Sequence, residues 1–164
     1  MARALIVGCG CRGRALGQAL TDQGWRLRGT TRSPEGLGAI ERAGIEPVVA
    51  DPDRVATILD HVGDVTVVVW ALGSAVGRPE SLAALHGPRL ERLLEELVDT
   101  PVRGFAYEAA GRVPDAYLRS GAAVVRAASE RWRIPVELLR HSPDDPAGWV
   151  TAATAAVLRL VEVP

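Results

Sequence analysis

The sequence contains no lysine and no asparagine, and all 19 of its basic residues are arginines. The lack of lysine excludes mechanisms that need its amine: Schiff-base formation, phosphate capture by a P-loop and Tyr/Lys acid–base catalysis. Aromatic residues make up only 4% of the chain, which disfavours a stacking platform for nucleic-acid bases. The only cysteines, Cys9 and Cys11, cannot form a disulfide framework, and the histidines, His61, His86 and His141, lack the spacing of a zinc site.

The length and charge of the chain fit one neutral domain. Its 164 residues are 48% apolar with a formal net charge of −1, so we expect a single domain over residues 1–164. This charge gives no reason to expect nucleic acid or an anionic membrane as a partner. The first apolar run, residues 4–7, is too short for a signal sequence, and no stretch approaches the roughly 18 apolar residues of a membrane span. We therefore expect a cytoplasmic protein without a membrane segment.

Short apolar runs alternate with amphipathic segments along the whole chain. We expect strands at residues 4–7, 25–29, 46–50, 65–72, 102–107 and 136–139, and helices at residues 14–23, 37–43, 53–61, 88–98, 115–131 and 149–161. The β-branched run at 65–72 suits a strand that is buried on both faces of a parallel sheet. This alternation predicts the α/β class, with a doubly wound, mostly parallel sheet of about six strands and ligands bound at its carboxyl edge.

The most informative stretch is a GxGxxG motif at residues 8–13, which follows the first strand and opens the first helix, as in a Rossmann fold. Gly8 permits the tight turn, Gly10 lets the backbone approach a pyrophosphate, and Gly13 lets the helix pack close to the strand. We expect this turn to bind a dinucleotide or a related adenosine ligand, through Gly8, Cys9, Gly10, Cys11, Arg12 and Gly13. The alternative is a glycine-rich turn that holds no ligand.

The end of the second strand indicates which nucleotide the turn would bind. A site for NAD(H) needs an acid there to accept from the ribose 2′-hydroxyl, and residues 28–33 contain none. Arg32 can instead pair with a 2′-phosphate, and Thr30, Thr31 and Ser33 can donate to its oxygens. We therefore expect NADP(H) in preference to NAD(H). The alternative is that Arg32 is an ordinary solvated loop arginine.

The same features also suit the start of an S-adenosylmethionine-dependent methyltransferase, which is the alternative function. That class usually carries an acid two positions before the first glycine, where this chain has Ile6. It carries another at the end of the second strand, where this chain has Thr31. The third glycine, Gly13, fits the dinucleotide pattern better, so the dinucleotide hypothesis is preferred.

Together, the motif at 8–13 and the segment 29–32 resemble the atypical and extended short-chain dehydrogenase/reductases, the NAD(P)-binding relatives of sugar-nucleotide epimerases. The resemblance implies that Asp51, at the end of the third strand, contacts the adenine amino group. It also implies that the residues after the fourth strand pass beneath the ribose and nicotinamide, namely Ala71, Leu72 and Gly73. Residues 126–130 and 134–140 are similar to the family's late helix and sixth strand, so the likeness covers most of the chain.

The chain departs from this family at the catalytic positions. Residues 105–111, after the start of the fifth strand, contain no Ser or Thr, and the catalytic Tyr/Lys pair is missing. Tyr107, Glu108 and His141, at the expected carboxyl edge, are candidate replacements, and Ser74 lies beyond the fourth strand on the same edge. The alternative for each is a loop residue with local hydrogen bonds. The resemblance thus implies either a reductase of a small carbonyl or imine compound or a non-catalytic nucleotide-binding module that senses redox state.

The extended families also carry a separate substrate domain, for which a chain of this length has no room. We therefore expect a substrate cleft that is small or shared with a second subunit, and a homodimer is a candidate assembly. Trp132 and Trp149 are candidate anchors of its interface. For Cys9 and Cys11 we expect a packing role in the turn rather than a reactive thiol.

Overall fold

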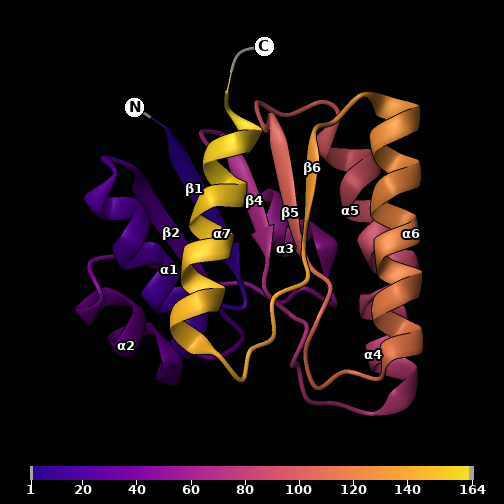
Figure 1. Ribbon diagram of the computed structural model, residues 1–164, viewed down its shortest axis with the longest axis horizontal. Coiled ribbons are helices and arrows are strands. Elements are labelled where there is room, and N and C mark those ends of the chain that lie inside the picture. The colour runs from indigo at the N-terminus through magenta and orange to yellow at the C-terminus, as the bar shows by residue number, and fades with distance from the viewer. Residues whose placement is uncertain (1, 163–164) are drawn as a thin grey trace.

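The computed structural model describes residues 2–162 and is built around a six-stranded parallel sheet (Figure 1). The strands are β1 (Arg3–Val7), β2 (Arg26–Thr31), β3 (Glu46–Val49), β4 (Val67–Trp70), β5 (Gly104–Glu108) and β6 (Val136–Leu139). Their order is β3-β2-β1-β4-β5-β6, and every neighbouring pair is parallel. The expected doubly wound α/β sheet is therefore confirmed, with a Rossmann-like strand order.

Helices cover both faces of this sheet (Figure 1). One face carries α1 (Cys11–Asp22), α2 (Leu37–Arg42) and α7 (Pro146–Leu160), and the other carries α3 (Val55–Leu59), α4 (Pro79–Leu85), α5 (Pro88–Leu97) and α6 (Asp115–Trp132). A short 3-10 helix, η1 (Pro34–Gly36), precedes α2. Across residues 2–162, no helix combines the length and the apolar character that a membrane crossing needs.

Strand β4 explains why the sequence around it is apolar without alternation. All four of its side chains are buried. Val68 and Trp70 belong to the core under α3, α5 and α6, whereas Val67 and Val69 belong to the core under α1, α2 and α7. A central parallel strand is buried on both faces, so each position is apolar whichever face it serves.

Several predicted boundaries differ from the structure for local reasons. The strand expected at 65–72 is only four residues long, because Val65 still lies in the preceding turn, where its N–H donates to the Val62 carbonyl at 3.1 Å. Helix α4 was not predicted, although Pro79 at its first turn and Glu80 beside it are typical start signals. Helix α7 likewise begins at a proline, Pro146, three residues before the predicted start.

The expectation that Trp149 anchors a subunit interface is wrong. Its side chain is fully buried on α7, in the core shared with β4 and β5. Trp132, at the end of α6, is only partly buried. The core of the single chain therefore buries Trp149 completely, and no partner chain is needed to cover it.

The sheet order places the turn after β1 beside the chain that leaves β4. β1 pairs with β2 on one side and β4 on the other, and the winding direction reverses between β1 and β4. The strands run downward in Figure 1, so their carboxyl ends share the lower edge of the sheet. In open α/β sheets, ligands bind at the carboxyl edge where the winding reverses, which directs attention to residues 8–13 and 71–75.

A fully buried polar pair, His86 and Tyr107, lies behind this edge. His86 Nε2 is 3.1 Å from the Leu72 carbonyl oxygen, which can only accept, so Nε2 carries the proton. Burial lowers the pKa of His86, and its neutral ring then accepts the Tyr107 hydroxyl at Nδ1, at 2.7 Å. The pair links the end of α4, the carboxyl end of β5 and the loop after β4.

Replacing Tyr107 with Phe is expected to lower the free energy of unfolding by about 1–3 kcal/mol, because Nδ1 of His86 would be buried without a donor. Urea denaturation measures this loss. Tyr117→Phe is the matched control, since the Tyr117 hydroxyl makes no hydrogen bond within residues 2–162, and it is expected to change stability by less than about 0.5 kcal/mol. Equal effects of the two substitutions would contradict the assignment.

Candidate functional site

The glycine turn is shaped by close contact with the chain after β4. Gly8 has φ +85°, and a Cβ there would lie 2.7 Å from the Ala71 carbonyl oxygen, so no other residue fits. The turn is tied to β2 by the Gly8 N–H, which donates to Thr30 Oγ1 at 3.2 Å, and by the Cys9 N–H, which donates to the Thr30 carbonyl at 3.1 Å. At Gly13 a Cβ would be 3.1 Å from Ile6 Cγ2, so α1 packs tightly on β1.

The N-terminus of α1 is left open by this turn. Its N-cap is Gly10, with no side-chain cap and no acid in the first turn. The N–H groups of the first helical residues therefore have no acceptor within the helix, and the helix dipole adds positive potential at the same point. A Cβ built on Gly10 meets nothing within 4 Å. This combination of open space and free donors suits an anion such as a phosphate.

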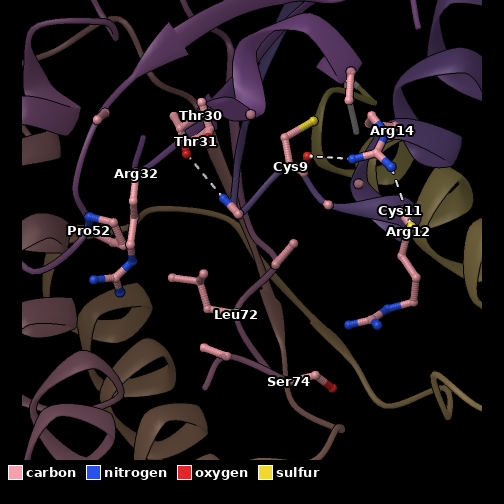
Figure 2. Close-up of a pocket in the computed structure, with 18 residues that line it drawn as sticks. Cys9, Cys11, Arg12, Arg14, Thr30, Thr31, Arg32, Pro52, Leu72 and Ser74 are labelled. Atoms are coloured by element: carbon pink, nitrogen blue, oxygen red, sulfur yellow. Dashed lines mark hydrogen bonds between the residues drawn. The ribbon is translucent and has the colours of Figure 1, made fainter. Parts of the chain in front are cut away.

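A cavity of about 440 Å³ opens over the turn (Figure 2). Eleven predicted cofactor-binding residues line it, namely Gly8, Cys9, Gly10, Cys11, Arg12, Gly13, Thr30, Thr31, Arg32, Ala71 and Leu72. The other three predicted residues, Ser33, Asp51 and Gly73, are sequence neighbours of lining residues but do not line the cavity themselves. Figure 2 shows Arg32 and Pro52 at one end of the cavity and Arg12 at the other, with Leu72 and Ser74 along one side.

Arg32 is not a free loop arginine. Its Nη1 lies 2.8 Å from Asp53 Oδ2 and 3.3 Å from Asp51 Oδ1, and about half of its side chain is exposed. Arg89, at the start of α5, approaches Asp53 from the other side at 3.6 Å. Two carboxylates therefore hold the guanidinium at the cavity, and a 2′-phosphate would have to displace them. Sequence reasoning missed Asp53, because nothing in the segment 51–54 marks which acid turns towards β2.

Arg12 lies where this cavity meets a second one of about 520 Å³. Both cavities are lined by Arg12, Ser74 and Ala75, and the second is completed by Val76, Gly77, Leu82, Arg112, Pro143 and Asp144. The two hollows thus adjoin along the loop after β4. Together they extend from Arg32 past the glycine turn to the loops after β5 and β6.

Glu108 is the buried partner of Arg12 and is not exposed to either cavity. Its carboxylate is fully buried and accepts from Arg12 Nη2 at 2.9 and 3.1 Å and from the Gly73 N–H at 2.7 Å. The Arg12 guanidinium also stacks over the Trp149 ring, 5.3 Å from its centroid. These contacts join four segments: the end of β5, the first turn of α1, the loop after β4, and α7.

The three candidate catalytic residues do not form one cluster. Tyr107 is buried against His86, and burial raises the pKa of its hydroxyl. The Glu108 carboxylate already accepts hydrogen bonds from Arg12 and from the Gly73 N–H. His141 lies at the start of the loop before α7, where Nε2 is 2.9 Å from Asp145 Oδ2. Only His141 makes the local loop hydrogen bond of the alternative, whereas Tyr107 and Glu108 lie in β5 and bond to segments distant in sequence. No group of three metal-ligating side chains occurs within residues 2–162.

The two cysteines differ in environment. Burial raises the pKa of the Cys9 thiol to about 12, and its Sγ fills the space against Gly29, where a Cβ would lie 2.6 Å from the sulfur. Cys9 is therefore a packing residue. Cys11 is exposed on the first turn of α1 and accepts a hydrogen bond from Arg14 Nη2 at 3.4 Å. Arg14 was not predicted to line the cavity, although its position one turn from Gly10 could have suggested it.

The Arg12–Glu108 contact is testable by a double-mutant cycle with Arg12→Met and Glu108→Gln. We expect Glu108→Gln alone to cost about 1–3 kcal/mol of unfolding free energy, at the low end for a buried ion pair because 25% of the Arg12 side chain is exposed. The double variant is expected to be more stable than the sum of the two single losses predicts, since it leaves no unpaired charge. Strictly additive losses in urea denaturation would show that the two side chains are not coupled.

Comparison with known proteins agrees with this geometry. No family model matches the chain. The chain is 34% identical over 80 residues to a short-chain dehydrogenase/reductase of Pestalotiopsis microspora, a match that covers 46% of this chain and 30% of that protein. It thus spans only a minor part of that relative.

Two solved structures extend the likeness to most of the chain. One is a short-chain dehydrogenase/reductase superfamily protein from Agrobacterium tumefaciens with bound NAD (TM-score 0.69, 21% identity, covering 84% of this chain and 48% of that one). The other is UDP-glucuronic acid 4-epimerase from Bacillus cereus in complex with NAD (TM-score 0.68, 18% identity, 85% and 56%). This chain therefore spans about half the length of each. None of these similarities supports the methyltransferase hypothesis. The expected resemblance is confirmed, and the chain has a Rossmann fold like that of the short-chain dehydrogenase/reductases and epimerases.

Proposed function

We propose that this domain binds a nicotinamide dinucleotide, with NADP(H) preferred, in the first cavity, with its nicotinamide end at the border with the second. The observation that carries the proposal is the open N-terminus of α1 beneath Gly10, where free backbone donors face the first cavity. The residues present fit this ligand, because the space beside Gly10 is open and is not filled by a side chain at that position. The two similar solved structures described above hold NAD, which supports a nicotinamide dinucleotide as the ligand.

The adenosine half would lie towards Arg32 and the nicotinamide half towards Arg12 and Ser74. Arg32 and Thr31 are the groups proposed to meet a 2′-phosphate. Because Asp51 and Asp53 already pair with Arg32, the phosphate must exchange with two carboxylates, and the expected preference for NADP(H) is modest. Asp51 faces Arg32 in this arrangement, so its role towards adenine is proposed only as a secondary one.

Of the two roles left open by the sequence, the second cavity favours the reductase. A bound, reduced nicotinamide supplies a hydride, and a cavity that adjoins the dinucleotide site gives a carbonyl or imine compound a place to receive it. The redox-sensing role is the alternative, because neither Tyr107 nor Glu108 reaches a cavity. Loss of NADPH absorbance in the presence of carbonyl compounds distinguishes the two roles.

Gly10→Val tests the binding site itself. The backbone at Gly10 is extended (φ −83°, ψ −156°) and its surroundings are empty, so we expect stability to change by less than about 1 kcal/mol. The valine side chain would occupy the phosphate position, so calorimetric titration with NADPH is expected to show no binding. Gly63→Val is the matched control, because a Cβ there also meets nothing within 4 Å and it lies far from both cavities. Undiminished NADPH binding by Gly10→Val would overturn the proposal.

Two substitutions test the preference for NADP(H). We expect Arg32→Ala to weaken NADPH roughly tenfold and NADH by less than about twofold, since one charge-assisted hydrogen bond is lost only with the former. Asp53→Asn removes a competing carboxylate from Arg32 and is expected to tighten NADPH about three- to fivefold. Arg42→Ala, which removes a positive charge outside the cavity, serves as the control. Equal losses for both dinucleotides in Arg32→Ala would show that Arg32 does not recognise the 2′-phosphate.

A further inference from the structure

We propose that the second cavity is the substrate subsite, and that it takes a small carbonyl compound with an apolar body and one carboxylate. The inference deepens the proposed function and rests on it for the identity of the ligand as a substrate. The cavity, of about 520 Å³, presents two kinds of surface. Its lining combines polar residues, among them Ser74 and Arg112, with the apolar residues Val76, Leu82 and Pro143.

Arg112 is held at the cavity by the loops after β4 and β5. The Val113 N–H donates to the Gly73 carbonyl at 3.0 Å, and the Arg112 N–H donates to Ser74 Oγ at 3.1 Å. A Cβ on Gly111 would collide with the Gly73 carbonyl oxygen, so the two loops pack together at this glycine. The backbone of Arg112 is therefore fixed beside Ser74, although its side chain is exposed.

The guanidinium of Arg112 is free to bind an anion. Within residues 2–162 it makes neither an ion pair nor a side-chain hydrogen bond, in contrast to Arg12 and Arg32 in the same pair of cavities. A planar guanidinium binds a carboxylate through two parallel hydrogen bonds. Asp144 also lines the cavity, and its carboxylate would repel a second negative charge on the ligand. A monocarboxylate therefore suits the site better than a dianionic phosphate.

Ser74 is the group proposed to bind the carbonyl oxygen. Its Oγ accepts from the Arg112 N–H, so its own proton remains available to an acceptor in the cavity. Ser74 lines both cavities and therefore lies where a substrate and the nicotinamide half of the cofactor would meet. Residues 105–111 contain no Ser or Thr, and Ser74 offers a hydroxyl from the loop after the neighbouring strand, β4, on the same edge.

The apolar side chains that line the cavity are proposed to contact the apolar body of the ligand. Val76 is 98% exposed, which is the largest exposure among the large apolar side chains of the described residues. Leu82, on α4, lines the same cavity. Exposed apolar surface at the rim of a cavity is stabilised when a ligand covers it. A 2-oxo acid with an aromatic or branched aliphatic group would contact both the polar and the apolar side chains of the cavity.

A matched pair of probes tests this inference by calorimetry. Phenylpyruvate and phenylacetone differ only in that a methyl group replaces the carboxylate, and both are titrated into the full chain, first alone and then with saturating NADP⁺. We expect wild-type protein to bind phenylpyruvate at least fivefold more tightly than phenylacetone. Arg112→Gln is expected to abolish this difference, whereas Arg119→Gln, an equal change of charge on exposed α6, is expected to keep it.

Two further variants separate the roles. Ser74→Ala is expected to weaken both probes, because both carry the carbonyl group, and to weaken phenylpyruvate more, because Ser74 Oγ also holds the Arg112 backbone. Asp144→Asn is expected to tighten phenylpyruvate about twofold. Equal binding of the two probes by wild type, or a difference that survives Arg112→Gln, would overturn the inference. Parallel titration with NADPH keeps the outcomes distinct. Dinucleotide binding without carboxylate selectivity refutes only the subsite, whereas carboxylate selectivity without dinucleotide binding refutes only the proposed cofactor.

Discussion

The site depends on the close approach of two backbones, the turn after β1 and the chain leaving β4. Gly8 lies so near the Ala71 carbonyl that it has no room for a side chain, and the Ala71 N–H donates to the Val7 carbonyl at 2.9 Å. This contact exists because β1 and β4 are neighbours, although 59 residues lie between Val7, the last residue of β1, and Val67, the first of β4. It turns α1 so that its free N–H groups face the cavity, and it brings Ser74 to the border between the two hollows.

A second constraint, the buried ion pair of Arg12 and Glu108, sets the opposite end of the site. A carboxylate without exposure to solvent is stable only when it is paired and hydrogen-bonded, and Glu108 meets both conditions. The pair fixes the Arg12 guanidinium against Trp149 and leaves the edge of that guanidinium between the cavities. Because its charge is balanced, Arg12 adds donors without strong positive potential. Arg112, which forms no ion pair within the described residues, is then the group proposed to bind an anion in the second cavity.

The sequence was sufficient to predict the six parallel strands, the helices on both faces and the position of the glycine turn, because these follow from local periodicity and from glycine spacing. It could not show what Arg32, Glu108 and Tyr107 contact. The partner of Arg32 follows β3, that of Glu108 is in the first turn of α1, and that of Tyr107 is His86, at the end of a helix that was not predicted. Such pairings depend on side-chain directions between distant segments. Trp149 shows the same limit, since an aromatic residue in a helix fits a core and an interface equally well.

The central claim is that the open end of α1 holds the diphosphate of a nicotinamide dinucleotide. Its most direct test is calorimetric titration of the wild-type chain with NADPH, NADH and S-adenosylmethionine under identical conditions. We expect one molecule of either dinucleotide to bind per chain, with NADPH modestly tighter, and S-adenosylmethionine not to bind. Binding of S-adenosylmethionine alone, or of none of the three, would contradict it.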